Sequence, residues 1–123
     1  MRGMNPADIL RAHAVRAPES AALLCGERTL SYAELDRTTD TLASWLLGEG
    51  LAPGDRVAIQ WPNAIELVQV FFAAFKAGIT AVPINLRLKP NEVAWLMQDA
   101  SPSLCFAHPA MADAVRQTGV RTL

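Results

Sequence analysis

The sequence contains few of the residues on which catalysis and metal binding usually depend. Its 123 residues include two histidines and two cysteines, and none of them has partners at metal-ligand spacing. The seven glycines are dispersed, so the chain has neither a dinucleotide fingerprint nor a glycine-rich loop that ends in lysine. Ser31 and Ser101 lack the surroundings of a nucleophile elbow. We therefore identify no catalytic, cofactor-binding or metal-binding residue in this chain.

The chain also lacks blocks of one charge and long apolar runs. It has 11 basic and 12 acidic residues, well mixed, which gives no basic surface for nucleic acid. The most apolar stretch, residues 64–77, contains three polar side chains and is shorter than the roughly 20 residues that span a bilayer. Residues 1–16 have no uninterrupted apolar core of the kind that a signal peptide needs. We expect a cytoplasmic protein without a transmembrane segment.

The sequence is, however, rich in apolar residues. They make up 51% of the chain against 19% charged residues, although a chain of this length has a large surface for its volume. This balance indicates apolar faces that another chain or segment covers, so we expect self-association. Cys25 and Cys105 lie in apolar runs, which favours two buried free thiols over a disulfide.

Capping and turn residues predict the first elements. Asn5 and Pro6 are typical of a helix start, and Pro18 ends that helix. Gly26 and Glu27 separate two short extended runs, 21–25 and 28–30, as in a two-residue hairpin turn with the glycine at positive φ. A capping box, Ser31 to Glu34, then begins a helix that ends near residue 48 or 50.

The rest of the chain alternates between strands and helices. We expect strands at 57–59, 80–84 and 103–107, helices at 63–77, 90–100 and 110–118, and a fourth strand that begins at 120. The helix at 63–77 is apolar on most of its circumference, so it packs on more than one side. This order predicts an α/β fold with a parallel sheet built from βαβ units, preceded by a helix and a short β-hairpin at an edge or on another layer.

Ligands of open parallel sheets bind beyond the carboxyl ends of the strands. At those ends Trp61, Asn63 and Asn85 are the candidates for a pocket wall, and Asn63 is a candidate for anion binding at a helix start. Each has a simpler explanation: Asn63 caps the helix, and Trp61 covers the edge of the sheet. The other polar residues favour structural roles, with His13 packed on a helix, His108 solvated in a loop, and Glu34, Asp36 and Asp40 on a solvated face.

A series of ordered segments extends over about 80 residues, from 30 to 107. They are 30–35 (LSYAEL), 54–59 (GDRVAI), the Pro62-Asn63 pair, 72–78 (FAAFKAG) and 82–85 (VPIN), followed by Arg87, Leu88 and Glu92. With these segments, residues 30–107 resemble the N-terminal part of adenylate-forming enzymes, the superfamily of acyl-CoA synthetases and peptide-synthetase adenylation domains.

The resemblance implies that residues 1–123 are an incomplete N-terminal portion of a large AMP-binding domain. Such ligases activate a carboxylic acid with MgATP to an acyl-adenylate and pass the acyl group to a thiol such as coenzyme A. The family's phosphate loop, adenine, magnesium and ribose motifs and its catalytic lysine match no position of this chain. We therefore expect the chain to be inactive alone and to bind neither MgATP nor coenzyme A.

Two alternatives remain open. The chain is either a non-enzymatic interaction module that pairs with another chain, or a small ligand-binding domain of flavodoxin type with Trp61 and Asn85 in its pocket. Neither the acid that a parent ligase activates nor its thiol acceptor follows from these residues.

Overall fold

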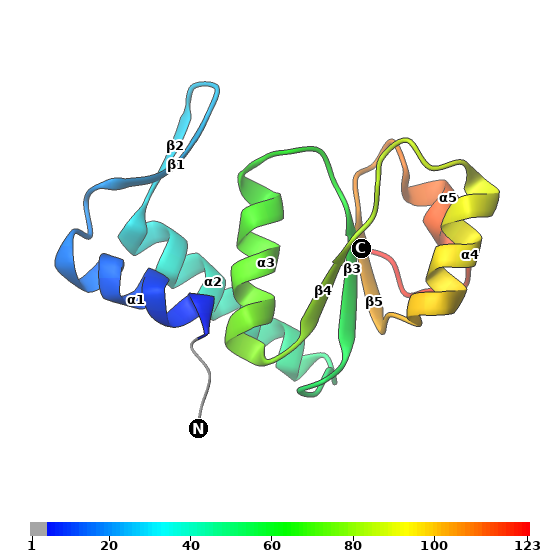
Figure 1. Ribbon diagram of the computed structural model, residues 1–123, viewed down its shortest axis with the longest axis horizontal. Helices are drawn as coiled ribbons and strands as arrows, with labels where there is room; N and C mark the ends of the chain where they lie inside the picture. The colour runs from blue at the N-terminus through cyan, green and yellow to red at the C-terminus, as the bar shows by residue number, and fades with distance from the viewer. Residues whose placement is uncertain (1–4) are drawn as a thin grey trace.

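The computed structural model describes residues 5–123, whose arrangement Figure 1 shows. Residues 1–4 lie outside the described residues. They are the start of the stretch, residues 1–16, that the sequence analysis distinguishes from a signal peptide. The elements of the described part are α1 (Pro6–Arg16), β1 (Ala21–Cys25), β2 (Arg28–Ser31), α2 (Tyr32–Gly48), β3 (Arg56–Gln60), α3 (Ile65–Ala77), β4 (Thr80–Pro83), α4 (Pro90–Ala100), β5 (Leu104–Ala107) and α5 (Ala112–Arg116). This order confirms the expected α/β fold with an N-terminal helix and hairpin.

β3 is the central strand of a parallel sheet with the order β4-β3-β5. Val57 pairs with Ala81 of β4 on one side and with Leu104 of β5 on the other. β3 is buried along its length except for its first residue, as a parallel strand covered on both faces requires. Beyond β5, Thr122 forms a parallel bridge with Cys105, at the place where the sequence predicts the start of a fourth strand.

Helices cover the two faces of this sheet (Figure 1). α3 and α2, which pack on each other, lie on one face, while α4 and α5 lie on the other. The first core consists of Ala43, Leu46, Leu51, Val57, Ala73, Ala74, Ala77, Ile79 and Leu104. The second consists of Ala58, Ile84, Val93, Met97, Cys105, Ala107, Ala112 and Val115. Successive residues of β3 thus enter different cores, because side chains alternate across a strand.

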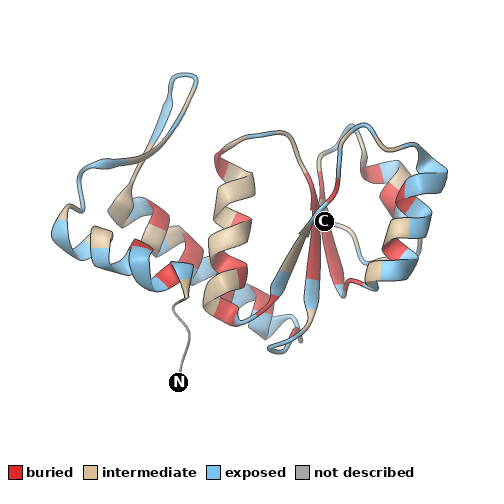
Figure 2. Cartoon of the chain, in the orientation of Figure 1, coloured by how far each residue is buried: buried red, intermediate tan, exposed pale blue. Residues whose placement is uncertain are grey.

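Residue burial follows these layers (Figure 2). No residue of α3 is exposed, which confirms that this helix packs on more than one side. Among the helices of the described residues, none is long and apolar enough to cross a membrane.

The helix ends explain why the chain turns where it does. Ser31 and Glu34 form the expected capping box, with the Glu34 amide donating to Ser31 Oγ over 3.1 Å. Gly78 ends α3 at φ 74°, a left-handed conformation that favours glycine. The predicted cap of α3 was wrong: Ala64 is the N-cap and makes no side-chain hydrogen bond, while Asn63 lies one residue before it.

The hairpin forms a separate antiparallel sheet next to α1 (Figure 1). Gly26 at its turn has φ 60°, as expected. Asn5 joins this end of the molecule to α3, because its Oδ1 accepts from the Ala7 amide over 2.9 Å and its Nδ2 donates to the Phe75 carbonyl over 2.7 Å.

Four charged residues connect α1, α2 and α3. Lys76 Nζ lies 2.6 Å from Asp36 Oδ1 and 2.8 Å from Asp40 Oδ1, and Arg11 pairs with the same two carboxylates. The hydrogen bond with Asp36 raises the pKa of Arg11. The prediction of a solvated face was wrong for Asp36, whose side chain is only 14% exposed because Lys76 covers it.

Candidate functional site

A hollow of about 440 Å³ lies at the carboxyl ends of β3 and β4. It brings together the three candidate wall residues of the sequence analysis, Trp61, Asn63 and Asn85. Its apolar lining consists of Ile59, Leu67, Pro83, Ile84 and Leu86. The strand ends meet here because parallel strands all finish at the same edge of the sheet.

The polar groups of this hollow are held by their neighbours. The Trp61 ring stands edge-on to the His108 ring, with 5.1 Å between centroids and 71° between planes. Asn85 Oδ1 accepts a hydrogen bond from the Arg87 amide over 2.9 Å. Asn63 is exposed at the rim. His108, expected to be solvated, is half-buried, and its Nδ1 accepts from the Ala110 amide over 3.2 Å.

Gln60 lies beneath this edge of the sheet and was not among the predicted residues. Its side chain is buried, and its Nε2 donates to the Asn85 carbonyl over 3.2 Å. Among the described residues, Gln60 Oε1 is the buried side-chain oxygen that has no protein donor. The signal in the sequence is a glutamine that directly follows the apolar run Val57 to Ile59.

The lining of the hollow carries no charged side chain. MgATP presents a triphosphate, which requires cationic or backbone N–H donors, and a magnesium ion, which prefers carboxylate oxygens. Within residues 5–123 no group of three or more His, Cys, Asp and Glu side chains could hold a metal ion. The side chains that line this hollow therefore offer no charged group to a triphosphate or to a magnesium ion.

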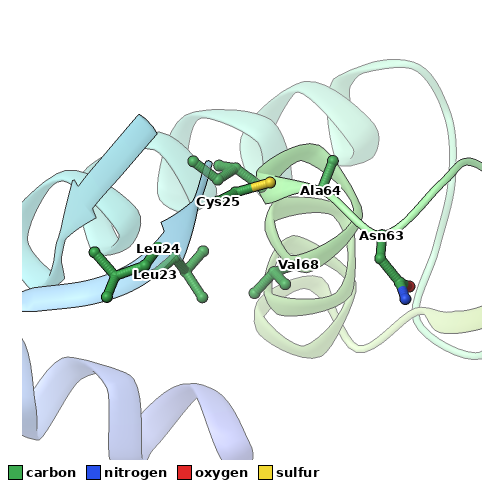
Figure 3. A pocket seen from close by; sticks show the side chains of 7 residues that line it. Leu23, Leu24, Cys25, Asn63, Ala64 and Val68 are labelled. Atoms are coloured by element: carbon green, nitrogen blue, oxygen red, sulfur yellow. The ribbon is translucent and has the colours of Figure 1, made fainter. Parts of the chain in front are cut away.

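A second hollow, of about 210 Å³, separates the hairpin from the start of α3 (Figure 3). Leu23, Leu24 and Cys25 of β1 line one side, and the segment from Asn63 to Val68 lines the other. The Cys25 sulfur points toward the start of α3 in this view. Apart from Asn63 and the thiol of Cys25, the side chains that line this second hollow are hydrocarbon.

The two thiols have different surroundings. Both cysteines are free, as expected, but Cys25 is half-buried rather than buried. Cys105 is fully buried in β5, and this burial raises the pKa of its thiol to about 11. His13 stacks on Tyr32 with 5.1 Å between ring centroids, which is a packing contact.

Comparison with known proteins gives the family. The model of the AMP-binding enzyme family matches residues 10–122. A fatty acid–[acyl-carrier-protein] ligase, ScoC, of Streptomyces coeruleorubidus is 39% identical over 94 residues, which cover 76% of this chain and 18% of ScoC. A 3-hydroxybenzoate–CoA/4-hydroxybenzoate–CoA ligase of Thauera aromatica is 36% identical over 107 residues, which cover 85% of this chain and 20% of the ligase. The chain thus spans about a fifth of the length of these relatives.

Solved structures show the same relationship. The crystal structure of VinN superposes with a TM-score of 0.93 and 31% identity, over 99% of this chain and 32% of VinN. The described helices, hairpin and parallel sheet therefore recur within VinN, a larger protein, of which they match 32%. Together with the family match over residues 10–122, this shows that the chain belongs to the AMP-binding family of adenylate-forming enzymes.

Proposed function

We propose that residues 1–123 form the N-terminal portion of the large AMP-binding domain of an acid–thiol ligase. The observation that carries this proposal is the family match over residues 10–122, which includes almost every described element. The relatives' length supports it, because they are about five times as long as the matched segment.

The proposed reaction of the whole enzyme has two steps. A carboxylate oxygen attacks the α-phosphorus of MgATP, pyrophosphate leaves, and an acyl-adenylate forms. A thiol sulfur, of coenzyme A or of a carrier protein, then attacks the acyl carbon, and AMP leaves. No step is assigned to a residue of this chain, since the lining of its strand-end hollow carries no charged side chain.

This segment contributes structure common to ligases with different acids. Relatives named for fatty acids and for hydroxybenzoates both match it, so the match does not indicate which acid the whole enzyme activates. We propose a carboxylic acid, MgATP and coenzyme A as the ligands of the whole enzyme. We place it in the cytoplasm, in the activation of fatty or aromatic acids.

Hydroxamate formation tests this proposal. The native gene product, captured with an antibody against this segment, would be incubated with MgATP, hydroxylamine and a panel of fatty and aromatic acids. We expect acid-dependent hydroxamate and AMP from the native product and none from the recombinant 123-residue chain. The proposal fails if the native product forms no hydroxamate with any acid, or if the short chain forms it alone.

A further inference from the structure

The β1–β2 hairpin is attached to the rest of the fold at its base. There the Tyr32 amide donates to the Ser20 carbonyl over 3.0 Å, and the Ala33 amide donates to the Pro18 carbonyl over 3.1 Å. The two strands contain no buried residue and belong to neither core. From this base the hairpin projects away from α1 and α2, with its turn at the far end (Figure 1).

One ion pair joins the far end of the hairpin to α3. Arg28 follows the turn directly, and its Nη1 lies 2.7 Å from Oε1 of Glu66, in the first turn of α3. The hydrogen bond from Arg28 lowers the pKa of Glu66, so this carboxylate is charged at neutral pH. Among the described residues, no other hydrogen bond or ion pair connects residues 21–30 to the rest of the chain.

Two hollows adjoin the hairpin. The hollow of about 210 Å³ separates β1 from the start of α3, and another, of about 350 Å³, lies between β1, α1 and α2. Leu23 of β1 lines both of them. A segment with unfilled space beside it lacks part of the close packing that holds core elements in one position. Local opening of such a segment therefore costs little free energy compared with unfolding of the sheet.

We propose that the hairpin is a flap that swings about its base, and that the Arg28–Glu66 ion pair is the latch that holds it against the start of α3. Because the latch lies at the end away from the base, its opening releases the whole length of both strands. β1 then moves away from α3 and exposes Cys25 and the apolar lining of the hollow beside it. This motion goes beyond the proposed ligase function and does not depend on it.

The latch is weak enough to open in the folded protein. The side chains of Arg28 and Glu66 are 58% and 38% exposed, so water and salt screen their charges. Loss of an exposed pair of this kind shifts an equilibrium by about two- to fivefold. The Cys25 sulfur points toward the start of α3 (Figure 3), so its rate of alkylation reports the position of the flap.

Alkylation of Cys25 by N-(1-pyrenyl)maleimide, followed by mass spectrometry, tests the latch. This reagent is bulky and uncharged, so a charge substitution neither attracts nor repels it. Glu66→Gln opens the latch and raises the labelling rate of Cys25 about two- to fivefold. Glu27→Gln removes the same charge from the exposed turn of the hairpin and, as the matched control, leaves the rate unchanged. The exchanged pair, Arg28→Glu with Glu66→Arg, restores the rate of the unmodified chain.

Cys105 in the same molecule distinguishes motion of the flap from unfolding. Its thiol is buried in β5, so it reacts only when the sheet opens. A faster reaction of Cys25 in Glu66→Gln, with an unchanged rate at Cys105, supports the proposal. The proposal is overturned if Glu66→Gln and Glu27→Gln label Cys25 equally fast, or if the rate at Cys105 rises by the same factor as that at Cys25. Labelling of the exchanged pair as fast as that of Glu66→Gln would also overturn it.

Discussion

At the scale of single residues, Asn5 joins two helices with one side chain. Its amide oxygen caps α1, and its amide nitrogen donates to the Phe75 carbonyl near the end of α3. That carbonyl belongs to the last turn of α3 and also accepts from the Gly78 amide over a longer distance, 3.4 Å. Asn5 therefore supplies a hydrogen bond at each of two helix ends.

Asn5→Ala removes both hydrogen bonds, and we expect it to lower the free energy of unfolding by about 2 kcal/mol. Asn5→Ser keeps a capping oxygen but loses the amide donor, so about half of this loss should remain. Urea denaturation of the three proteins measures the difference. Equal stability of the serine variant and the unmodified chain would show that the contact with Phe75 contributes nothing, and equal stability of the two variants would show that the cap contributes nothing.

The buried thiol of Cys105 gives a pH dependence. Burial raises its pKa from 9.0 to about 11, so the folded state holds the proton more tightly than the unfolded state does. The resulting stability is complete below the unfolded pKa and is lost as pH rises through the interval from 9.0 to about 11. The folded protein thereby disfavours the thiolate, the form that reacts with alkylating agents.

We expect the melting temperature of the chain to fall more steeply across this interval than that of Cys105→Ala, in which the titrating thiol is absent. Melting curves at several pH values measure both slopes. Parallel slopes would contradict the assigned pKa. In the folded chain at neutral pH, iodoacetamide should label Cys25 before Cys105.

At the scale of elements, local patterns predicted the elements well. The Asn5-Pro6 start of α1, the capping box of α2 and the Gly78 stop of α3 are all present. Each of these helix ends depends on residues within one turn of it, so a short stretch of sequence is enough to predict it. The alternation of strands and helices likewise specified the parallel sheet.

Contacts between distant residues were not predictable in this way. Asp36 was expected in solvent, but it pairs with Lys76, 40 positions later, because α2 packs on α3. Polar side chains of α3 similarly face other elements, since Glu66 is paired to Arg28 of β2. The cap of α3 was also wrongly predicted. Asparagine is a favoured N-cap residue, but the N-cap of α3 is Ala64, the residue after Asn63.

In the cluster of Arg11, Asp36, Asp40 and Lys76, we expect the loss of either cation to change the stability of the fold by a different amount. The Lys76 side chain is 10% exposed, whereas that of Arg11 is 55% exposed. Lys76→Met should lower the free energy of unfolding by about 2 kcal/mol, because Asp36 loses its covered partner while Arg11 still compensates part of the charge. Arg11→Met should cost less than about 1 kcal/mol, as for other exposed pairs.

Chemical denaturation with urea at low and high salt measures these effects. The loss caused by Lys76→Met should persist in high salt, since covered pairs are screened less than exposed ones. An effect of Arg11→Met equal to or larger than that of Lys76→Met would show that burial does not govern this cluster.

At the scale of the whole molecule, the sheet and the hairpin differ in the support that they receive. β3 has a hydrogen-bonded strand on each side and a core on each face, whereas β1 and β2 pair only with each other and contain no buried residue. An isolated two-stranded hairpin is marginally stable in water. Native-state hydrogen exchange should therefore be slowest in β3 and fastest, among the strands, in β1 and β2. Equal protection of the hairpin and β3 would mean that the chain unfolds only as one unit.

The sequence predicted where the candidate site lies, but not which side chains contact one another there. The rule for parallel sheets led to Trp61, Asn63 and Asn85, which line one hollow. The sequence did not indicate that His108 packs on Trp61 or that Gln60 lies beneath, because both follow from the way in which β5 and β4 flank β3. Membership of the AMP-binding family came from ordered motifs, which the family match over residues 10–122 confirms.

The central claim is that this chain is one portion of a larger AMP-binding domain. The size of the native gene product tests it most directly, by immunoblot of the source cell with an antibody against residues 5–123. Since 107 matched residues make up 20% of one relative, that relative is about four times as long as this chain, and we predict a band at about four times 13.3 kDa. A single band at 13.3 kDa would contradict the claim and would make this chain a product with a function of its own.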